Sequence, residues 1–284
     1  MPFFDTSIVE SPYESAIVEA GHYGIHNFSY GIFDTYFQLD RSSPEWFGER
    51  ILNLRSPQGL YKTWVFNWLQ QKSDAELLRD LQKRGPVYSQ QRLPLRGESK
   101  FVEVAYDLST VLNPETYLNH KKRHKALYYP QRWFKANGFK LVTIECCARE
   151  EIKQLHDQWV EHKLAQPTTY KLMFPRARYW NCCLKSFKNK RYFNFGCLNS
   201  AGELVAVRIL YQEGDAVFDL AQFAATWKLP SNFSEAFAMM TMLEMRDLGM
   251  KYLNCGASLN KSLSAFKHHW QSFEVQSWAY AKQS

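Results

Sequence analysis

A run of three short apolar segments followed by one long helical pattern constrains the fold of this chain most strongly. The segments cover residues 192–198, 204–211 and 216–223, and short polar stretches at 199–202 and 213–215 separate them. This spacing is typical of antiparallel hairpins. A helix is predicted over 233–248, with Asn232 and Glu235 placed to cap it and Gly249 to end it, before a strand at 252–254. The order predicts an α+β fold, with a mixed, largely antiparallel sheet and flanking helices.

Upstream of this pattern, strand-like and helix-like segments alternate. Strands are predicted over 30–39, 101–108 and 140–146, helices over 44–54, 73–84, 113–127 and 149–163, and 62–69 fits a strand or a buried helix. Ser73 and Glu76 have the spacing of a capping box, and Pro130 is predicted to interrupt the helix that Pro114 opens. The change of pattern predicts two domains, residues 1–110 and 111–284.

The composition is that of an ordered globular protein. Of the 284 residues 45% are hydrophobic, and no apolar run reaches the roughly 18 to 20 residues that a membrane-spanning helix needs. The first residues lack the layout of a signal peptide, so a cytoplasmic location is expected. The six cysteines are not spaced as a secreted disulfide framework or as a zinc site, which predicts reduced, structural thiols and no metal.

Positive charge is concentrated in the middle of the chain. The formal net charge is +7, yet residues 100–200 alone hold 18 Lys and Arg against 8 Asp and Glu, which is +10. Such a field favours an anionic partner such as tRNA, DNA, a nucleotide cofactor or an anionic surface, and the alternative is a solvated face. Nearby aromatic residues such as Tyr128 and Tyr129 are candidates for stacking on bases. The candidate anion-binding residues are Lys121, Lys122, Arg123, Lys125, Arg176 and Arg178.

Several segments, taken in order, carry a family resemblance. They are the basic helix at 117–127, the helix with Trp159 and Lys163, the strand at 204–208, and residues 248–258 and 263–267. This succession resembles the GNAT superfamily, and more closely its tandem-domain branch, the Fem-type peptidoglycan aminoacyl transferases and the aminoacyl-phosphatidylglycerol synthase catalytic domains. The resemblance covers roughly residues 105–284. It implies two tandem GNAT-like domains, the N-terminal one degenerate, and an acyltransferase activity.

The same resemblance implies a role for Phe266 and Lys267. In that family the segment corresponding to this pair contributes to the active site, where the lysine is associated with the ester carbonyl of the donor or with the oxyanion. Acyl transfer passes through a tetrahedral species whose oxyanion needs a donor within about 3 Å, worth roughly 3–4 kcal/mol. The attacking amine must lose a proton, and the candidate bases are Asp219, which is favoured, and His268 or His269. An inward-facing Asp219 would need a partner.

The segment before the long predicted helix is the candidate donor-binding loop. Family members that use acetyl-CoA carry a [Gln/Arg]-x-x-Gly-x-[Gly/Ala] loop whose amides bind pyrophosphate at the helix N-terminus. Here Ala225 replaces the first glycine, and Trp227 stands where a small residue is expected. Acyl-CoA is thereby put in doubt but stays open, and aminoacyl-tRNA suits the missing glycine. The candidate donor-binding residues are Gln222, Ala225, Thr226, Trp227, Lys228, Ser231, Asn232 and Phe266.

Together these features predict an N-acyltransferase. It would move an acyl or aminoacyl group from acyl-CoA or aminoacyl-tRNA to an amine on a small molecule, a peptide or an aminated nucleic-acid base. The alternative is a non-catalytic nucleic-acid-binding module derived from such an enzyme, whose binding would be salt-sensitive and independent of Lys267 and Asp219. A metal hydrolase is disfavoured, because His156 and His162 lie six residues apart and no His-Glu-x-x-His pattern occurs.

Overall fold

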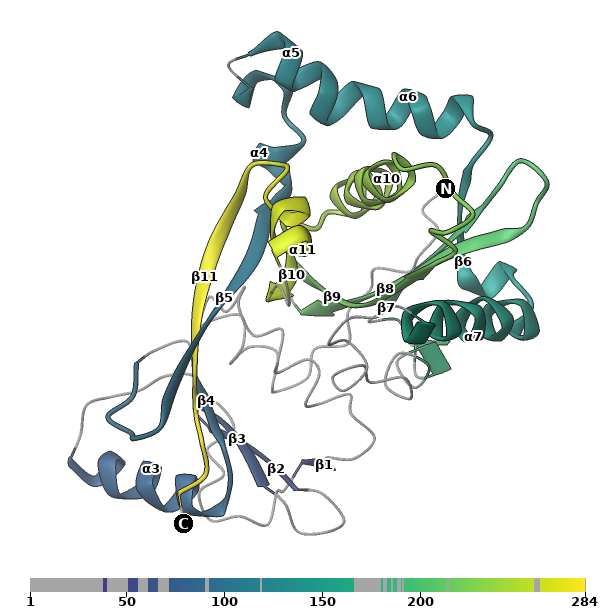
Figure 1. The fold of residues 1–284 in the computed structure, drawn as a ribbon. Coiled ribbons are helices and arrows are strands. Elements are labelled where there is room, and N and C mark those ends of the chain that lie inside the picture. Colours follow the sequence, from purple (N-terminus) through teal and green to yellow (C-terminus); the bar gives the residue numbers. More distant parts are fainter. Residues whose placement is uncertain are drawn as a thin grey trace. The chain divides into compact units, whose positions relative to one another are not determined.

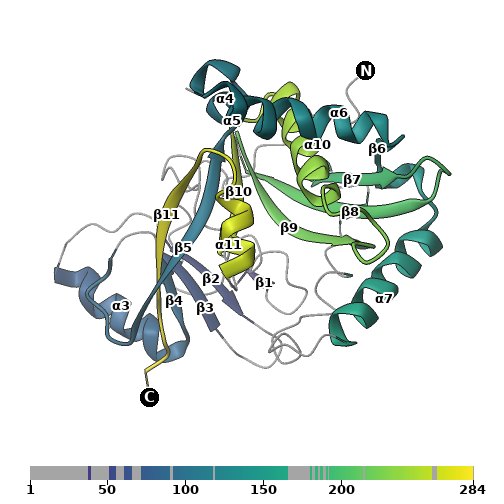
Figure 2. The same ribbon diagram turned by 45° about the horizontal axis from the view of Figure 1, so that its top comes forward.

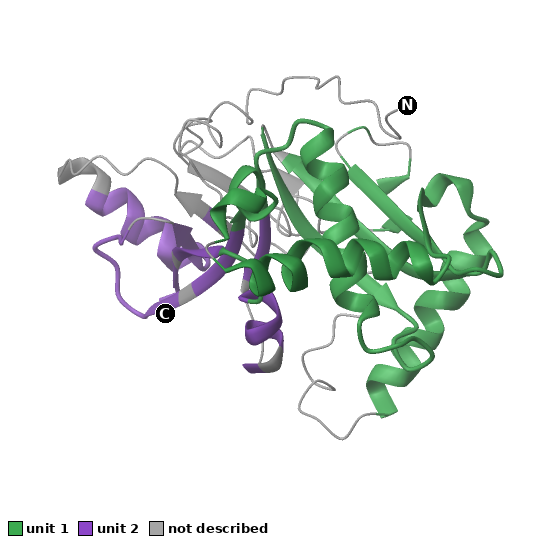
Figure 3. Cartoon of the chain, turned by 90° about the horizontal axis from the view of Figure 1, so that it is seen from above, with its two compact units in different colours: residues 1–8, 106–253, 269–271 green, residues 9–105, 254–268, 272–284 purple. Residues whose placement is uncertain are grey.

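The structure, a computed structural model, divides into two compact units. It describes residues 38–39, 51–55, 61–65, 72–89, 92–117, 119–165, 180, 183–184, 186–187, 190, 192–213, 215–257 and 261–283. One unit holds residues 106–253 and 269–271, and the other holds the described residues up to 105 together with 254–268 and 272–283 (Figure 3). Each unit is built from separate stretches of the chain, so the domain boundary at residue 110 stays a prediction.

The predicted meander forms the sheet of the first unit. Strands β7 (Tyr192–Leu198), β8 (Leu204–Glu213) and β9 (Ala216–Ala224) pair antiparallel in sequence order, and β6 (Lys140–Thr143) pairs antiparallel with the outer edge of β7 (Figure 1). The largely antiparallel sheet predicted from the sequence is therefore confirmed. The strand predicted over 140–146 is too long, because a 3₁₀ turn, η3 (Ile144–Cys146), follows Thr143.

Helices cover both faces of this sheet. Helix α10 (Phe233–Asp247) lies on one face and α7 (Arg149–Ala165) on the other, as Figures 1 and 2 show. Residues 192–197 of β7 are consequently all buried, whichever face their side chains point to. Above α10 lies α6 (Tyr129–Ala136), and the ring of Phe139 joins the two helices by lying 5.1 Å from that of Phe233 and 5.6 Å from that of Phe134.

The helical stretch before α6 differs from its prediction. A single helix over 113–127 is wrong, because two asparagines each start a separate helix. Asn113 caps the 3₁₀ turn η1 (Pro114–Thr116), and Asn119 caps α5 (His120–Arg123) by accepting from two backbone amides. A π-helical turn, η2 (His124–Tyr128), then leads directly into α6.

Pro130 does not interrupt the chain of helical turns. It is the second residue of α6, where a missing amide proton costs little, and the wider π turn precedes it. Proline cannot donate to the carbonyl of Ala126, four residues earlier, but the indole Nε1 of Trp270 does so at 3.2 Å. A buried tryptophan thus replaces the hydrogen bond that the proline removes, which explains why the predicted interruption is wrong.

The second unit contains further strands and two described helices, α3 (Lys72–Arg84) and α11 (Lys261–Lys267). The strands in spatial order are β1 (Gln38–Leu39), β2 (Ile51–Arg55), β3 (Tyr61–Val65), β4 (Val87–Ser89), β11 (Ser272–Tyr280) and β5 (Glu98–Asp107). Strands β3 and β4 are parallel, whereas β2 with β3 and β4 with β11 are antiparallel. The predicted helix at 73–84 is confirmed as α3 (Lys72–Arg84), and it packs Leu78 and Leu81 against Val87 and Tyr280.

Two elements predicted near the start of this unit are described only in part. A helix over 44–54 is wrong for its described end, because residues 51–55 pair along β3 as a strand, and residues 44–50 lie outside the described residues. The strand predicted over 30–39 is described only at β1. The remaining elements are α4 (Leu108–Val111), β10 (Tyr252–Ala257) and α11 (Lys261–Lys267). Strand β10 is longer than its predicted range of 252–254.

Candidate active site

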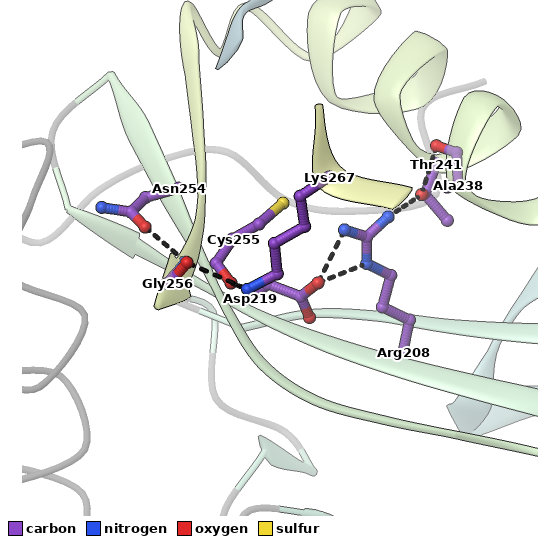
Figure 4. Close-up of polar contacts among 8 residues, drawn as sticks. All are labelled: Arg208, Asp219, Ala238, Thr241, Asn254, Cys255, Gly256 and Lys267. Carbon is purple, nitrogen blue, oxygen red and sulfur yellow. Dashed lines mark hydrogen bonds and ion pairs between the residues drawn. The ribbon is translucent and has the colours of Figure 1, made fainter. Parts of the chain in front are cut away.

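Lys267, the last residue of α11, is held by the backbone of β10. Its side chain is only 7% exposed, and its ammonium donates hydrogen bonds to the carbonyl oxygens of Cys255 and, at 2.9 Å, Gly256 (Figure 4). Consecutive carbonyls of a regular strand point in opposite directions. Gly256 has a φ of 67°, in the left-handed region that favours glycine, and this turn lets both carbonyls face one ammonium. The lysine that the resemblance singled out is therefore fixed in place.

Two buried polar side chains hold this turn in place. The side-chain oxygen of Asn254 accepts from the amide of Gly256 at 2.6 Å, and its side-chain nitrogen donates to Oε2 of Glu103 at 2.9 Å. Asn254 and Glu103 are 0% and 1% exposed. Because each buried polar group here is partnered, the backbone that holds Lys267 has one defined geometry.

Asp219 has the partner that its place on a buried strand requires. Its Oδ2 accepts from Nη2 of Arg208 at 2.7 Å and from Nε at 3.2 Å (Figure 4). Arg208 is 3% exposed and also donates to the hydroxyl of Thr241 on α10, which in turn donates to the carbonyl of Ala238 at 2.9 Å. The guanidinium is thus bound on two sides, so the pair is a fixed element of the sheet and its covering helix.

A β-bulge in β9 is what brings Asp219 to this arginine. Gln222 lies directly opposite Arg208, and a residue three positions away on a regular strand would point to the other face. The register shifts so that Leu220 is the extra residue, and Asp219 lies opposite Leu210. Both Asp219 and Gln222 therefore face the same side of the sheet as Arg208. Bulges of this kind are common beside active sites, where they re-aim side chains.

Backbone amides of the candidate donor loop already donate hydrogen bonds within the protein. The amide of Ala225 donates to the carbonyl of Val205 at 2.9 Å, and the amides of Thr226 and Lys228 donate to carbonyls within the loop at 2.8 Å. A pyrophosphate-binding loop needs such amides to point toward the ligand. In addition, Glu235 lies in the first turn of α10, where its negative charge opposes an anion at the helix N-terminus.

The side chains of this loop are also engaged. The ring of Trp227 stacks on that of His162 of α7, with 4.5 Å between centroids. Asn232 makes no capping hydrogen bond, contrary to its prediction, because its side-chain nitrogen donates to the hydroxyl of Tyr129 at 3.1 Å. Next to His162, burial lowers the pKa of Lys163 below its ordinary value. Thr226, Lys228 and Ser231 are exposed, and Gln222 and Phe266 are half-buried.

The alternative candidate bases make other contacts. Nε2 of His269 lies 2.9 Å from Oε1 of Glu235, and Nδ1 of His268 lies 2.8 Å from the hydroxyl of Ser272. Lys267 belongs to one compact unit and Asp219 to the other. Of the candidate anion-binding residues, Lys121, Lys122 and Lys125 are exposed and Arg123 is half-buried, while Arg176 and Arg178 lie outside the described residues.

The side chains that position Lys267 and Asp219 were not predicted from the sequence. Arg208, Thr241, Asn254 and Glu103 are buried polar or charged side chains, and none was a candidate. A charged residue inside a strand of apolar neighbours was the one signal that could have found Arg208. Across the described stretches, no three His, Cys, Asp or Glu side chains gather as metal ligands would. Within the same stretches, each helix is too short or too polar to cross a lipid bilayer.

Comparison with known proteins places this fold. Neither a protein-family model nor a curated protein sequence matches the chain. Among solved structures, L-PGS from Bacillus licheniformis is similar, with a TM-score of 0.59, 17% identity, and 98% of this chain and 95% of that chain covered. The C-terminal domain of a putative lysylphosphatidylglycerol synthetase from Agrobacterium fabrum has a TM-score of 0.56 and 11% identity, with 96% of this chain and 93% of that chain covered. FemX has a TM-score of 0.55 and 10% identity, with 96% of each chain covered.

These similarities run almost the whole length of each protein. The chain therefore has the fold of L-PGS and FemX, and the predicted resemblance to Fem-type proteins and aminoacyl-phosphatidylglycerol synthases is confirmed at the level of the fold.

Proposed function

We propose that this chain is an acyltransferase that moves an aminoacyl or acyl group from a carrier ester or thioester onto an amine. The observation that carries the proposal is Lys267, a buried ammonium fixed by two carbonyls of β10. The fold shared with L-PGS and FemX supports the proposal, since the name of the Agrobacterium protein describes the joining of lysine to a phospholipid.

Lys267 would stabilise the developing oxyanion. The amine attacks the acyl carbonyl, and the tetrahedral species places negative charge on the carbonyl oxygen. A cation that is already oriented stabilises this charge without reorganisation, and one such donor is worth roughly 3–4 kcal/mol. Collapse of the tetrahedral species forms the amide bond, breaks the bond to the carrier and returns a proton to the leaving oxygen or sulfur.

The attacking amine must lose a proton, and Asp219 is the proposed base. Arg208 holds one oxygen of its carboxylate, and this fixes the direction in which the group points. The bulge in β9 orients the carboxylate in the same direction as Gln222, a residue of the candidate donor loop. Orientation by a second group is the usual arrangement for a catalytic base.

An aminoacyl-tRNA is the favoured donor. Acyl-CoA recognition through a pyrophosphate loop would need free amides at a helix N-terminus, whereas the amides of Ala225, Thr226 and Lys228 donate to carbonyls. Glu235 adds a negative charge at the same place. An aminoacyl ester on tRNA places no pyrophosphate there, so these features do not oppose it.

A transfer assay tests the proposal. The purified chain is incubated with aminoacyl-tRNA labelled in the amino acid, and separately with labelled acetyl-CoA, over a panel of amines from small molecules, peptides and aminated nucleotides. We expect label to move from tRNA to an acceptor, and Lys267→Met to slow this transfer. Transfer from acetyl-CoA alone would overturn the choice of donor. Tight tRNA binding with no transfer from either donor would instead support the non-catalytic nucleic-acid-binding module.

A further inference from the structure

The helical stretch 120–136, formed by α5, η2 and α6, has a strongly basic surface. It contains six Lys and Arg residues and no Asp or Glu. We call its exposed residues other than Ala136 the basic face: His120, Lys121, Lys122, Lys125, Tyr128, Tyr129, Arg132 and Lys135. Without a carboxylate in the stretch, these charges add to a field that attracts a polyanion.

Two adjacent tyrosines lie within this face. Tyr128 and Tyr129 are 38% and 40% exposed, so they are among the most exposed large apolar side chains in the described residues. Neighbouring lysines and an arginine precede and follow them along the helix. Exposed aromatic rings between cationic side chains match the requirements of single-stranded nucleic acid, in which bases stack on rings while phosphates pair with cations.

The apolar side of the same stretch is already buried. Leu127 and Phe134 are each 2% exposed, and Ala126 and Pro130 are buried as well. A helix that binds a membrane needs its apolar side free to enter the lipid. That side here packs against the protein, so the exposed chemistry favours a nucleic acid over a lipid surface.

The basic face is connected to the candidate donor loop. The hydroxyl of Tyr129 accepts a hydrogen bond from the side-chain nitrogen of Asn232, the last residue before α10, at 3.1 Å. On the opposite side of the stretch, Trp270 donates to the carbonyl of Ala126, and Trp270 follows Lys267 by three residues in the sequence. A polyanion bound to the basic face would thus touch a residue that contacts the donor loop.

We infer that the basic face is the docking surface for the tRNA that carries the acyl group. This inference rests on the proposed function and adds the surface that holds the carrier. Lys121, Lys122 and Lys125 contact phosphates, and Tyr128 stacks on an unpaired base. Tyr129 links the bound RNA to Asn232 at the donor loop.

Binding of uncharged tRNA, measured by fluorescence anisotropy over a range of salt concentrations, tests this surface without requiring catalysis. The triple variant Lys121→Ala/Lys122→Ala/Lys125→Ala should bind about 10- to 100-fold more weakly, and the salt slope should fall by about 2 to 3, since each phosphate contact contributes about 0.7 to 0.9. The matched control is Arg79→Ala/Lys83→Ala/Lys100→Ala, which removes the same charge from exposed positions in the other unit. Equal losses in the two triple variants would show a general charge effect and overturn the inference.

The tyrosine separates stacking from charge. Tyr128→Ala should weaken tRNA binding by about 5- to 150-fold, whereas Tyr128→Phe keeps the ring and should bind like the unaltered protein. Unchanged binding by Tyr128→Ala would contradict the stacking contact. Binding to vesicles that contain phosphatidylglycerol tests the alternative of a lipid surface. If the lysine triple variant loses vesicle binding but keeps tRNA binding, the face binds a membrane and the inference is overturned.

The same measurements distinguish this inference from the proposed function. Lys267→Met should bind tRNA normally while transferring slowly. If the lysine triple variant binds tRNA and transfers as well as the unaltered protein, the docking surface is wrong and the acyltransferase stands. If tRNA binding depends on the face but no acyl transfer occurs, the docking surface stands and the proposed function fails.

Discussion

The two compact units each bury a cation, and they hold it in different ways. Arg208, 3% exposed, is bound by the carboxylate of Asp219 and the hydroxyl of Thr241. Lys267, 7% exposed, is bound by the carbonyls of Cys255 and Gly256. A carboxylate cancels the charge of its partner, whereas a carbonyl is a neutral acceptor. The bonds to β10 therefore orient the ammonium of Lys267 through neutral acceptors.

This difference separates a structural role from a catalytic one. Arg208 joins β8, β9 and α10 through its partners, so its own loss should appear first in stability. Lys267 sits at the end of a short helix above a glycine turn, and its loss should appear first in the rate of acyl transfer. This distinction is wrong if the loss of Arg208 and the loss of Lys267 both act mainly on stability, or both mainly on the transfer rate.

The largest effect on stability is expected for Asp219→Ala. Removing the carboxylate leaves the buried guanidinium of Arg208 without its anion, which costs about 3–5 kcal/mol of unfolding free energy. Urea denaturation followed by circular dichroism measures this loss. The double variant Arg208→Met/Asp219→Leu should recover most of it, because neither charge then remains. As a control, Asp247→Ala breaks the exposed pair with Arg246 and should change stability by less than about 1 kcal/mol.

The next effect falls on catalysis, for Lys267→Met. The substitution keeps much of the side-chain length but removes the ammonium, so the rate constant for acyl transfer should drop about 100- to 1,000-fold, equivalent to roughly 2.7–4 kcal/mol. Single-turnover measurements of transfer from labelled aminoacyl-tRNA report this rate. Lys261→Ala, at the exposed start of the same helix, is the matched control and should transfer at the normal rate. A normal rate for Lys267→Met would remove the oxyanion role.

Much of the fold could be predicted because local patterns decide it. The meander has short polar turns between apolar strands, and α3, α7 and α10 have periodic apolar residues over several turns. The failures occur where distant residues decide. Residues 51–55 form a strand through pairing with β3, and Trp270 supplies the hydrogen bond that lets the helical chain pass Pro130.

The candidate site could be predicted only in part, for a related reason. Lys267 and Asp219 stand out by family resemblance and by charge, but their partners do not. Arg208 meets Asp219 only because an extra residue shifts the register of β9, and no local pattern marks that bulge. Glu103 and Asn254 are 151 positions apart, and the acceptors of Lys267 are backbone carbonyls, which have no sequence signature.

Gly256→Ala tests whether the glycine turn in β10 positions Lys267. A φ of 67° is strained for a residue with a side chain, so we expect a loss of about 1–2 kcal/mol in unfolding free energy. If the backbone relaxes away from this conformation, the two carbonyls no longer converge on the ammonium, and the transfer rate should fall as well. Gly249→Ala is the control, because its φ of 86° is equally strained but it follows the C-cap of α10 and belongs to the other compact unit. A loss of stability with a normal transfer rate is expected for that control only.

The smallest effect concerns Asp107, a carboxylate that accepts hydrogen bonds from neutral donors. Burial raises the pKa of Asp107, but hydrogen bonds from Ser109 and Thr110 outweigh it, and the pKa lies below its ordinary value. Asp107 caps α4, so Asp107→Ala should cost about 1 kcal/mol near pH 7.

The pH dependence of this cost follows from the direction of the shift. Because the folded pKa is lowered, the stabilisation is complete above the unfolded pKa of about 3.9 and is lost as the pH falls through the folded pKa. The difference in unfolding free energy between the unaltered protein and Asp107→Ala should therefore shrink as the pH is lowered from 7 to 3. Asp107→Asn keeps a neutral acceptor at the cap and should cost less than Asp107→Ala at pH 7. A difference that stays constant down to pH 3 would show that the ionised carboxylate contributes nothing, and that neutral partners do not stabilise a charge at this site.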